Sequence, residues 1–117
     1  MIKLIASDMD GTMLRDDKYL NPEIFPVIKQ LYQKGILFAP ASARHISSLE
    51  RLFAPVMEEI YLIAENGACV WHGGKDIICD PMDKDLVLGI VKACKEIPGV
   101  GILAEARDCL LYTSENT

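Results

Sequence analysis

The amino-acid sequence predicts an α/β fold built on a parallel sheet, and three observations support this prediction. Short apolar runs suited to buried strands lie at residues 2–7, 36–39 and 61–64. Helix patterns separate these runs, which gives the β-α-β-α-β order of parallel strands joined by crossover helices. With 117 residues, 50% of them hydrophobic and 25% charged, the chain suits one folded core and is too short for two full domains.

The first half of the chain supplies the elements of this sheet. Residues 2–7 form the first strand, which we expect to be buried on both faces because a single charge interrupts it. Asn21 is placed to cap the first helix, with Pro22 at its first position and Gly35 after its last turn. A second helix begins near Ile46 and leads to the third strand.

The pattern changes in the second half of the chain. Four further strand-like runs lie two on either side of a helix, at residues 68–72, 75–79, 101–104 and 109–113. Gly73-Gly74 between the first two predicts a hairpin turn. Asp83 is placed to cap the helix, whose apolar stripe from Leu86 to Cys94 we expect to face a core. We place the boundary between the two regions near Pro81.

Charge and hydropathy narrow the classes of function. The 17 acidic residues outnumber the 12 basic ones, and the net charge of −5 has the wrong sign for binding nucleic acid or anionic lipid. No uncharged apolar run approaches the ~20 residues that span a bilayer, and Asp8 interrupts the N-terminal segment before a signal peptide could develop. We therefore expect a soluble, cytoplasmic protein with a small-molecule ligand, and neither nucleic acid nor membrane as partner.

Polar residues follow each of the three parallel strands, where ligands bind in open α/β sheets. They are Asp8-Met9-Asp10-Gly11-Thr12, Ser42-Ala43-Arg44 and Glu65-Asn66-Gly67. Asp8 and Asp10 lie close enough for their charges to conflict unless a cation intervenes, and Mg²⁺ prefers few carboxylates together with water and substrate phosphate. With the hydroxyl of Ser42 available for a phosphate oxygen, the pattern indicates phosphoryl transfer through a carboxylate nucleophile.

Structural roles are alternatives for several of these residues. Acidic residues after a strand commonly serve as caps and turns. Arg44 can touch a substrate or form an ion pair near the site, and Asn66-Gly67 can form a turn or a specificity element. His45, at a helix start, is interpreted as a capping or surface residue, and we assign the role of general base neither to it nor to His72.

Three short sequences resemble the motifs of one phosphatase family. DMDGT resembles the first motif of haloacid dehalogenase (HAD) superfamily phosphatases, and ASAR resembles the second. AENGA is similar to the I-x-x-N-G-A stretch of the Cof-type subfamily, whose members carry an inserted C2 cap domain. The resemblance implies a Rossmann-like HAD core, of which residues 1–80 form the N-terminal part, followed by residues 81–117 as the beginning of a truncated α+β cap.

The resemblance also implies roles for individual residues. Asp8 is the nucleophile that becomes an aspartyl-phosphate, and Asp10 is the general acid/base. Mg²⁺ is held by the Asp8 carboxylate and the Asp10 carbonyl, while Ser42 and the amides of Met9 and Ala43 bind phosphate. The expected activity is Mg²⁺-dependent hydrolysis of a small soluble phosphate monoester such as a sugar phosphate.

Two further parts of the family's site have no counterpart in the sequence. They are a Lys that neutralises the phosphate and a late Gly-Asp-rich motif that completes the metal shell. We therefore expect the chain to be the N-terminal portion of a longer phosphatase, with little or no turnover by itself. We also expect residues 2–7 to leave an unpaired apolar sheet edge, so that the chain can self-associate through this edge or through the incomplete cap.

Two other classes of function fit parts of the same pattern. A non-catalytic module with this fold would keep the sheet and act as a binding or regulatory partner. A receiver-like domain would accept a phosphoryl group on an Asp after the third strand, where this chain has Glu65-Asn66-Gly67.

Overall fold

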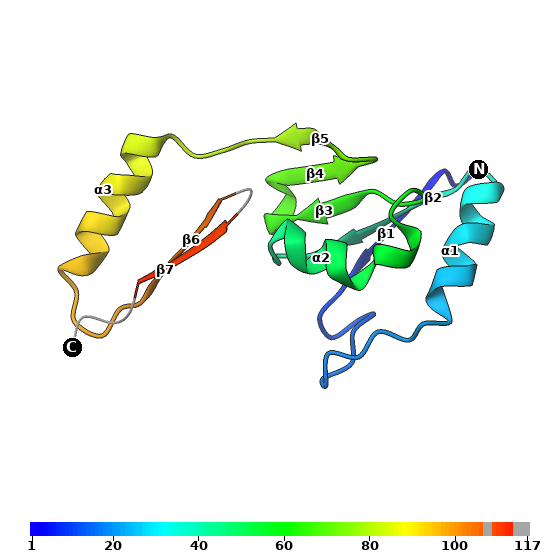
Figure 1. Ribbon diagram of the computed structural model, residues 1–117, viewed down its shortest axis with the longest axis horizontal. Helices are drawn as coiled ribbons and strands as arrows, with labels where there is room; N and C mark the ends of the chain where they lie inside the picture. Colours follow the sequence, from blue (N-terminus) through cyan, green and yellow to red (C-terminus); the bar gives the residue numbers. More distant parts are fainter. Residues whose placement is uncertain (107–108, 114–117) are drawn as a thin grey trace. The chain divides into compact units, whose positions relative to one another are not determined.

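The computed structural model describes residues 1–106 and 109–113. The chain divides into two compact units, Met1–Asp80 and Pro81–Thr117. The first unit holds every residue that the sequence nominates for chemistry, so its sheet and helices position the candidate site (Figure 1).

The first unit is built on a five-stranded sheet in the order β1-β2-β3-β4-β5. The first three strands are parallel to one another, and the last two follow as antiparallel neighbours. This arrangement confirms the predicted parallel sheet followed by a hairpin. The strands are β1 (Leu4–Asp8), β2 (Leu37–Ala41), β3 (Leu62–Ala64), β4 (Cys69–His72) and β5 (Lys75–Cys79).

Two helices connect the parallel strands. They are α1 (Ile24–Gln33) and α2 (Ile46–Leu52), and short 3₁₀ turns follow α2 and β3 at η1 (Ala54–Val56) and η2 (Glu65–Gly67). Because right-handed crossovers that advance in one direction place their helices on one face of a sheet, we expect α1 and α2 on the same face, and residues of both helices belong to one core. Phe25 of α1 meets Phe53 after α2 with ring centroids 6.4 Å apart.

The start of α1 differs from the prediction. Asn21 and Pro22 belong to a turn that precedes the helix, and the helix begins at Ile24. The side-chain oxygen of Asn21 accepts a hydrogen bond from the Glu23 amide at 3.0 Å. Asn21 therefore accepts the bond from the second residue after it that a cap makes, as the pattern indicates, but the regular helix begins two residues later than Pro22.

A single hydrophobic core lies between the helices and the sheet of the first unit. Its members come from β1's exit loop, both helices, η1 and the strands, and they are Met9, Leu14, Ile28, Phe38, Ile46, Leu49, Phe53, Val56, Ile60, Leu62, Ala64 and Cys69. Met9 and Leu14 are the members that matter for function, because they flank the polar residues after β1. Buried side chains therefore anchor the loop that carries these polar residues to the core.

Strand β1 corrects one expectation and confirms another. The prediction that it is buried on both faces is wrong, since Leu4 is 53% exposed and Ile5 is 36% exposed. Among the described residues β1 pairs with β2 alone and stands at the end of the sheet. The expected unpaired apolar edge is therefore present.

The second unit contains helix α3 (Lys84–Lys95) and a two-stranded antiparallel sheet of β6 (Ile102–Ala106) and β7 (Cys109–Thr113). Asp83 caps α3 as predicted, because its Oδ1 accepts a hydrogen bond from the Leu86 amide at 3.0 Å. The apolar stripe of α3 is not buried in a core: Leu86 is 55% exposed and Ile90 is 44% exposed. Within the described part of the chain no helix has the length and apolar character that crossing a membrane requires.

Candidate active site

The register of the parallel strands brings the polar loops together at one edge of the sheet. Asp8 at the end of β1 lies opposite Ala41, the last residue of β2, and Ala41 in turn lies opposite Ile63 of β3. The Ser42 amide donates to the Ile63 carbonyl at 2.9 Å, and the Asn66 amide donates to the Ser42 carbonyl at 3.1 Å. The three predicted polar segments are therefore neighbours in space.

The loop after β1 is a tight turn built around Met9. The Met9 side chain is fully buried, while Asp8 and Asp10 on either side of it are exposed. The Met9 carbonyl accepts hydrogen bonds from the amides of Thr12 at 3.1 Å and Leu14 at 2.8 Å. Gly11 has φ +76°, a conformation that glycine adopts without strain. One buried apolar side chain thus directs two carboxylates toward solvent.

Asp8 presents an exposed carboxylate at the end of β1. Its Oδ2 accepts a hydrogen bond from the Thr12 hydroxyl at 3.2 Å. The structure gives the other oxygen, Oδ1, no hydrogen-bond partner within residues 1–106. A carboxylate held through one oxygen, with the other uncommitted, suits a nucleophile or a metal ligand.

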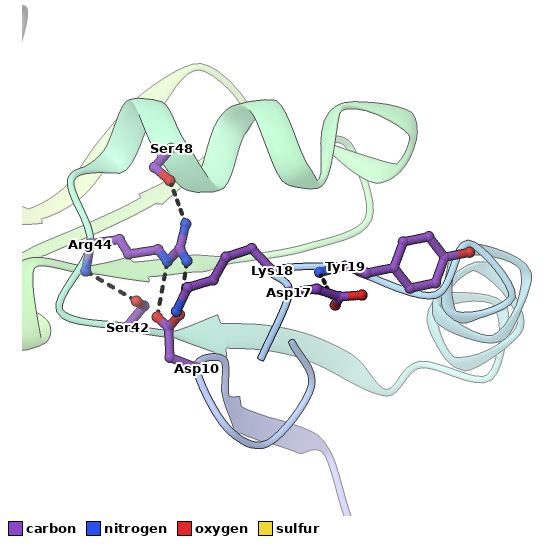
Figure 2. A network of polar contacts seen from close by, with 7 residues as sticks. All are labelled: Asp10, Asp17, Lys18, Tyr19, Ser42, Arg44 and Ser48. Carbon is purple, nitrogen blue, oxygen red and sulfur yellow. Dashed lines mark hydrogen bonds and ion pairs between the residues drawn. The ribbon is translucent and has the colours of Figure 1, made fainter. Parts of the chain in front are cut away.

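Asp10 is held by two cations (Figure 2). Arg44 donates from Nε to Oδ2 at 2.9 Å and from Nη2 to Oδ1 at 2.8 Å, which makes a bidentate pair. Lys18 donates from Nζ to Oδ1 at 2.9 Å. The hydrogen bonds from Arg44, and then that from Lys18, hold the pKa of the Asp10 carboxyl well below its usual range. Hydrogen bonding to Asp10 likewise raises the pKa of Arg44.

Arg44 is itself anchored to α2 and to the loop after β2. Its Nη1 donates to the Ser48 hydroxyl at 3.1 Å, and its backbone amide donates to the Ser42 hydroxyl at 3.0 Å. The ion-pair interpretation of Arg44 is therefore confirmed. Ser42 is buried, and because its oxygen accepts from Arg44, its own proton remains available to an oxygen of a ligand.

The two histidines have structural roles. His45 is 6% exposed and caps α2, since its Nδ1 accepts from the Ser47 amide at 3.3 Å. The capping interpretation is confirmed, and the surface alternative is wrong. The Nε2 of His45 also lies 3.9 Å from Oε1 of Glu65. His72 stacks on Tyr61 with ring centroids 4.1 Å apart, which is a packing contact.

The roles of two residues of the site were missed by the sequence analysis. Thr12 is named there only as part of the polar loop, although a hydroxyl four residues after an Asp in a tight turn can reach back to its carboxylate. Lys18 had no such signal. Lys18 reaches Asp10 because the chain folds back through an isolated bridge between Leu14 and Leu20, and no sequence pattern predicts this bridge.

The oxygen atoms of this loop fit part of a Mg²⁺ site. The Asp8 carboxylate and the backbone carbonyl of Asp10 are hard donors of the kind that Mg²⁺ prefers. Among the described residues there is no group of three or more His, Cys, Asp or Glu side chains that could hold a metal ion. The loop therefore suits a cation that keeps water and phosphate as its remaining ligands, rather than one enclosed by protein side chains.

Comparison with known proteins shows which family this chain resembles. A family model described as haloacid dehalogenase-like hydrolase matches residues 5–117. The 5-amino-6-(5-phospho-D-ribitylamino)uracil phosphatase YbjI of Escherichia coli is 39% identical over 104 residues, which cover 88% of this chain and 38% of that protein. The HMP-PP phosphatase of Serratia proteamaculans is 37% identical over 71 residues, or 61% of this chain and 26% of that protein.

A solved structure supports the same relationship. A crystal structure from Eubacterium rectale superposes with a TM-score of 0.81 and 33% identity, and the match covers 93% of this chain and 42% of that one. The chain thus spans well under half the length of the relatives it matches.

Proposed function

Because the chain belongs to the haloacid dehalogenase-like hydrolase family, we propose that it supplies the nucleophile of a phosphatase acting on small soluble phosphate monoesters. Asp8 is that nucleophile, and the reaction passes through an aspartyl-phosphate. One observation carries this proposal: the Asp8 carboxylate is exposed at the carboxyl end of a parallel strand, in register with the residue that precedes Ser42. Ligands of open α/β sheets bind at this position.

The proposal extends to the division of the chain. Met1–Asp80 is the N-terminal part of the catalytic core, and Pro81–Thr117 is the beginning of a cap that selects the substrate. Because the chain spans less than half of its relatives, turnover, substrate and partners are proposed for the whole protein. We expect little turnover from these 117 residues alone, since they lack the family's phosphate-binding Lys and its Gly-Asp-rich motif.

The reaction has two halves. An oxygen of Asp8 attacks phosphorus, the bond to the ester oxygen breaks, and the leaving alcohol takes a proton from Asp10. Water then attacks the aspartyl-phosphate and gives a proton to Asp10. This step releases inorganic phosphate and restores the Asp8 carboxylate. The Ser42 hydroxyl and the amides of Met9 and Ala43 bind the phosphate oxygens during both halves.

The acid/base role places a condition on Asp10. A carboxylate that accepts three hydrogen bonds from Arg44 and Lys18 is ionised and holds no proton to donate. Asp10 therefore has to give up part of this pairing when substrate binds. Mg²⁺, held by the Asp8 carboxylate and the Asp10 carbonyl, would offset the negative charge of the phosphate when bound.

The relatives indicate the class of substrate. The names of the Escherichia coli and Serratia proteins both specify small phosphorylated compounds. We propose a phosphate monoester of similar size, such as a sugar phosphate, and a cytoplasmic location where such compounds are available.

The proposal can be tested on the chain as it stands. Beryllofluoride mimics a phosphoryl group on a carboxylate, so ¹⁹F NMR with Mg²⁺ should show a bound signal that Asp8→Asn abolishes. Asp16→Asn is the matched control, because it removes an exposed carboxylate from the same loop and should leave the signal intact.

The other outcomes separate the alternative functions. A bound signal that survives Asp8→Asn but disappears in Glu65→Gln would support the receiver-like reading instead. No bound signal in the unmodified chain would contradict the phosphatase proposal and favour a non-catalytic module.

A further inference from the structure

We infer that Lys18 is an anion-binding residue of this site, whose ammonium group moves from Asp10 to a phosphate oxygen of the incoming substrate. The inference rests on the proposed phosphatase function and names a residue that the sequence motifs do not include. The ligand chemistry is that of a phosphate monoester dianion. The juxtaposition of Lys18, Arg44 and Asp10 carries the inference (Figure 2).

In the cluster at Asp10, two positively charged side chains pair with one carboxylate, so one positive charge is in excess. Arg44 already occupies both oxygens of the carboxylate, through Nε and Nη2. Lys18 adds a third hydrogen bond to an oxygen that Arg44 also uses. Two cations therefore share one carboxylate, and a lysine ammonium group has three donors, of which this contact uses one. The surplus charge stands two residues from the proposed nucleophile.

The two cations differ in how firmly they are held. The Arg44 side chain is 26% exposed, and it is tied to Ser48 as well as to Asp10. The Lys18 side chain is 63% exposed, and Asp10 is the one acceptor that the described residues give it. An exposed lysine pair of this kind is weak in water, typically about 0–1 kcal/mol. Lys18 can therefore leave Asp10 for a ligand while Arg44 keeps its position.

The backbone holds Lys18 at this place. Its amide donates to the Arg15 carbonyl at 2.8 Å, and the Arg15 amide donates to the Tyr19 carbonyl at 3.2 Å. Lys18 has φ +63°, a left-handed conformation that a non-glycine residue adopts at a small cost. The turn is closed beneath by the Leu14–Leu20 bridge, and Leu14 is buried in the core. The ammonium group thus extends from a defined turn.

Charge also distinguishes this side of the loop from the hollow beside it. An open hollow of about 520 Å³ is lined by Gly11, Thr12, Leu14, Arg15, Asp16 and Asp17. Arg15 is the cation there, and its Nε lies 3.9 Å from Asp17. Two carboxylates against one guanidinium repel an anion, whereas Lys18 and Arg44 outnumber the one carboxylate that they share. A phosphate group is therefore expected at Lys18 and not in the hollow.

The experiment measures binding of inorganic phosphate, with Mg²⁺ present, to the 117-residue chain and three variants. Lys18→Ala should weaken binding about tenfold, the effect of losing one charge-assisted hydrogen bond. Lys18→Arg should restore most of the affinity. Lys29→Ala, which removes an exposed lysine from α1, is the matched control and should change affinity less than twofold.

A direct readout separates ligand contact from loop support. In the unmodified protein, the side-chain ε-CH₂ signal of Lys18, identified by its absence in Lys18→Ala, should shift on phosphate addition. If affinity falls in Lys18→Ala but this signal does not move, Lys18 only supports the loop and the inference is wrong. Equal losses in Lys18→Ala and Lys29→Ala would overturn it as well, since they would indicate a general charge effect.

Beryllofluoride binding keeps this result distinct from the parent proposal. If beryllofluoride binds in an Asp8-dependent way while Lys18→Ala leaves phosphate affinity unchanged, the Lys18 inference fails and the phosphatase proposal stands. If beryllofluoride does not bind, the phosphatase proposal fails and the inference fails with it.

Discussion

The two compact units of the chain carry similar apolar patterns but bury them very differently. Helices α1 and α3 are both amphipathic, yet Ile28 of α1 is fully buried and no residue of α3 is buried. In the first unit, η1 and strands β2, β3 and β4 supply core residues for the helices to cover. The described part of the second unit supplies only a two-stranded sheet. Apolar periodicity therefore predicts a helix, whereas burial depends on the partners available to cover its face.

This difference explains where the candidate site can be ordered. Met9 and Leu14 belong to the core of the first unit, and they fix the loop that presents Asp8 and Asp10. A loop with such anchors holds its polar groups in place before a ligand arrives, which phosphoryl transfer requires.

The largest expected effect comes from removing a core residue of the first unit. Phe53 is fully buried and contacts the rings of Phe25 and Phe38, so Phe53→Ala should lower the free energy of unfolding by about 3–5 kcal/mol. The single tryptophan, Trp71, packs against this core. Urea unfolding followed by tryptophan fluorescence therefore measures the stability of the first unit.

The matched variant lies in the second unit. Leu86→Ala removes an apolar side chain that is 55% exposed and should change the same free energy by less than about 0.5 kcal/mol. Comparable losses in the two variants would show that α3 contributes to the core after all. If Phe53→Ala does not fold, Phe53→Leu keeps most of the apolar volume and still tests the ranking.

An intermediate effect is expected at the edge of the sheet, where the first unit behaves like the second. Leu4 on β1 is 53% exposed beside unpaired backbone groups, and lysine at such an edge opposes strand-to-strand pairing. Leu4→Lys should weaken self-association about tenfold, since burying a leucine contributes about 1.5–3 kcal/mol. Sedimentation velocity over a range of concentrations measures this change.

A substitution away from the edge provides the control. Val27 on α1 is 46% exposed, and Val27→Lys adds the same charge without touching β1. A chain that remains monomeric at all concentrations, or a Val27→Lys effect as large as that of Leu4→Lys, would rule out association through β1.

The order of the elements was predictable because local patterns determine it. Each parallel strand, the hairpin and the Asp83 cap follow from periodicity, turn residues and capping chemistry in short windows of sequence. The exposure of β1 was not predictable from its own residues, because an apolar strand has the same sequence pattern whether or not a neighbouring strand covers it. Only the expectation of an incomplete sheet anticipated it.

The site divides in the same way. Asp8 ends β1, and Asp10, Ser42 and Arg44 lie within three residues of a strand end, so the sheet rule alone nominates them. The contact between Lys18 and Asp10 depends on how the chain returns after residue 14, and this path is set by tertiary contacts of Leu14 and Leu20. A residue whose role comes from loop closure leaves no periodic or spacing signal.

The smallest expected effect concerns the Asp10–Arg44 pair, which charge and not burial holds in place in the first unit. Asp10 has a pKa below its ordinary value in the folded protein, so its pairing adds stability above the unfolded value of about 4. This contribution declines as the pH falls below about 4 toward the lower folded pKa. Arg44→Ala should therefore reduce the free energy of unfolding by up to about 1 kcal/mol at pH 6, because solvent screens a partly exposed pair. The difference from the unmodified chain should narrow at pH 3.

The control variant is Arg51→Ala, which removes an exposed arginine from α2 and should show no such narrowing. If the loss in Arg44→Ala is equal at both pH values, packing against Ser48, and not the charge of Asp10, gives Arg44 its effect.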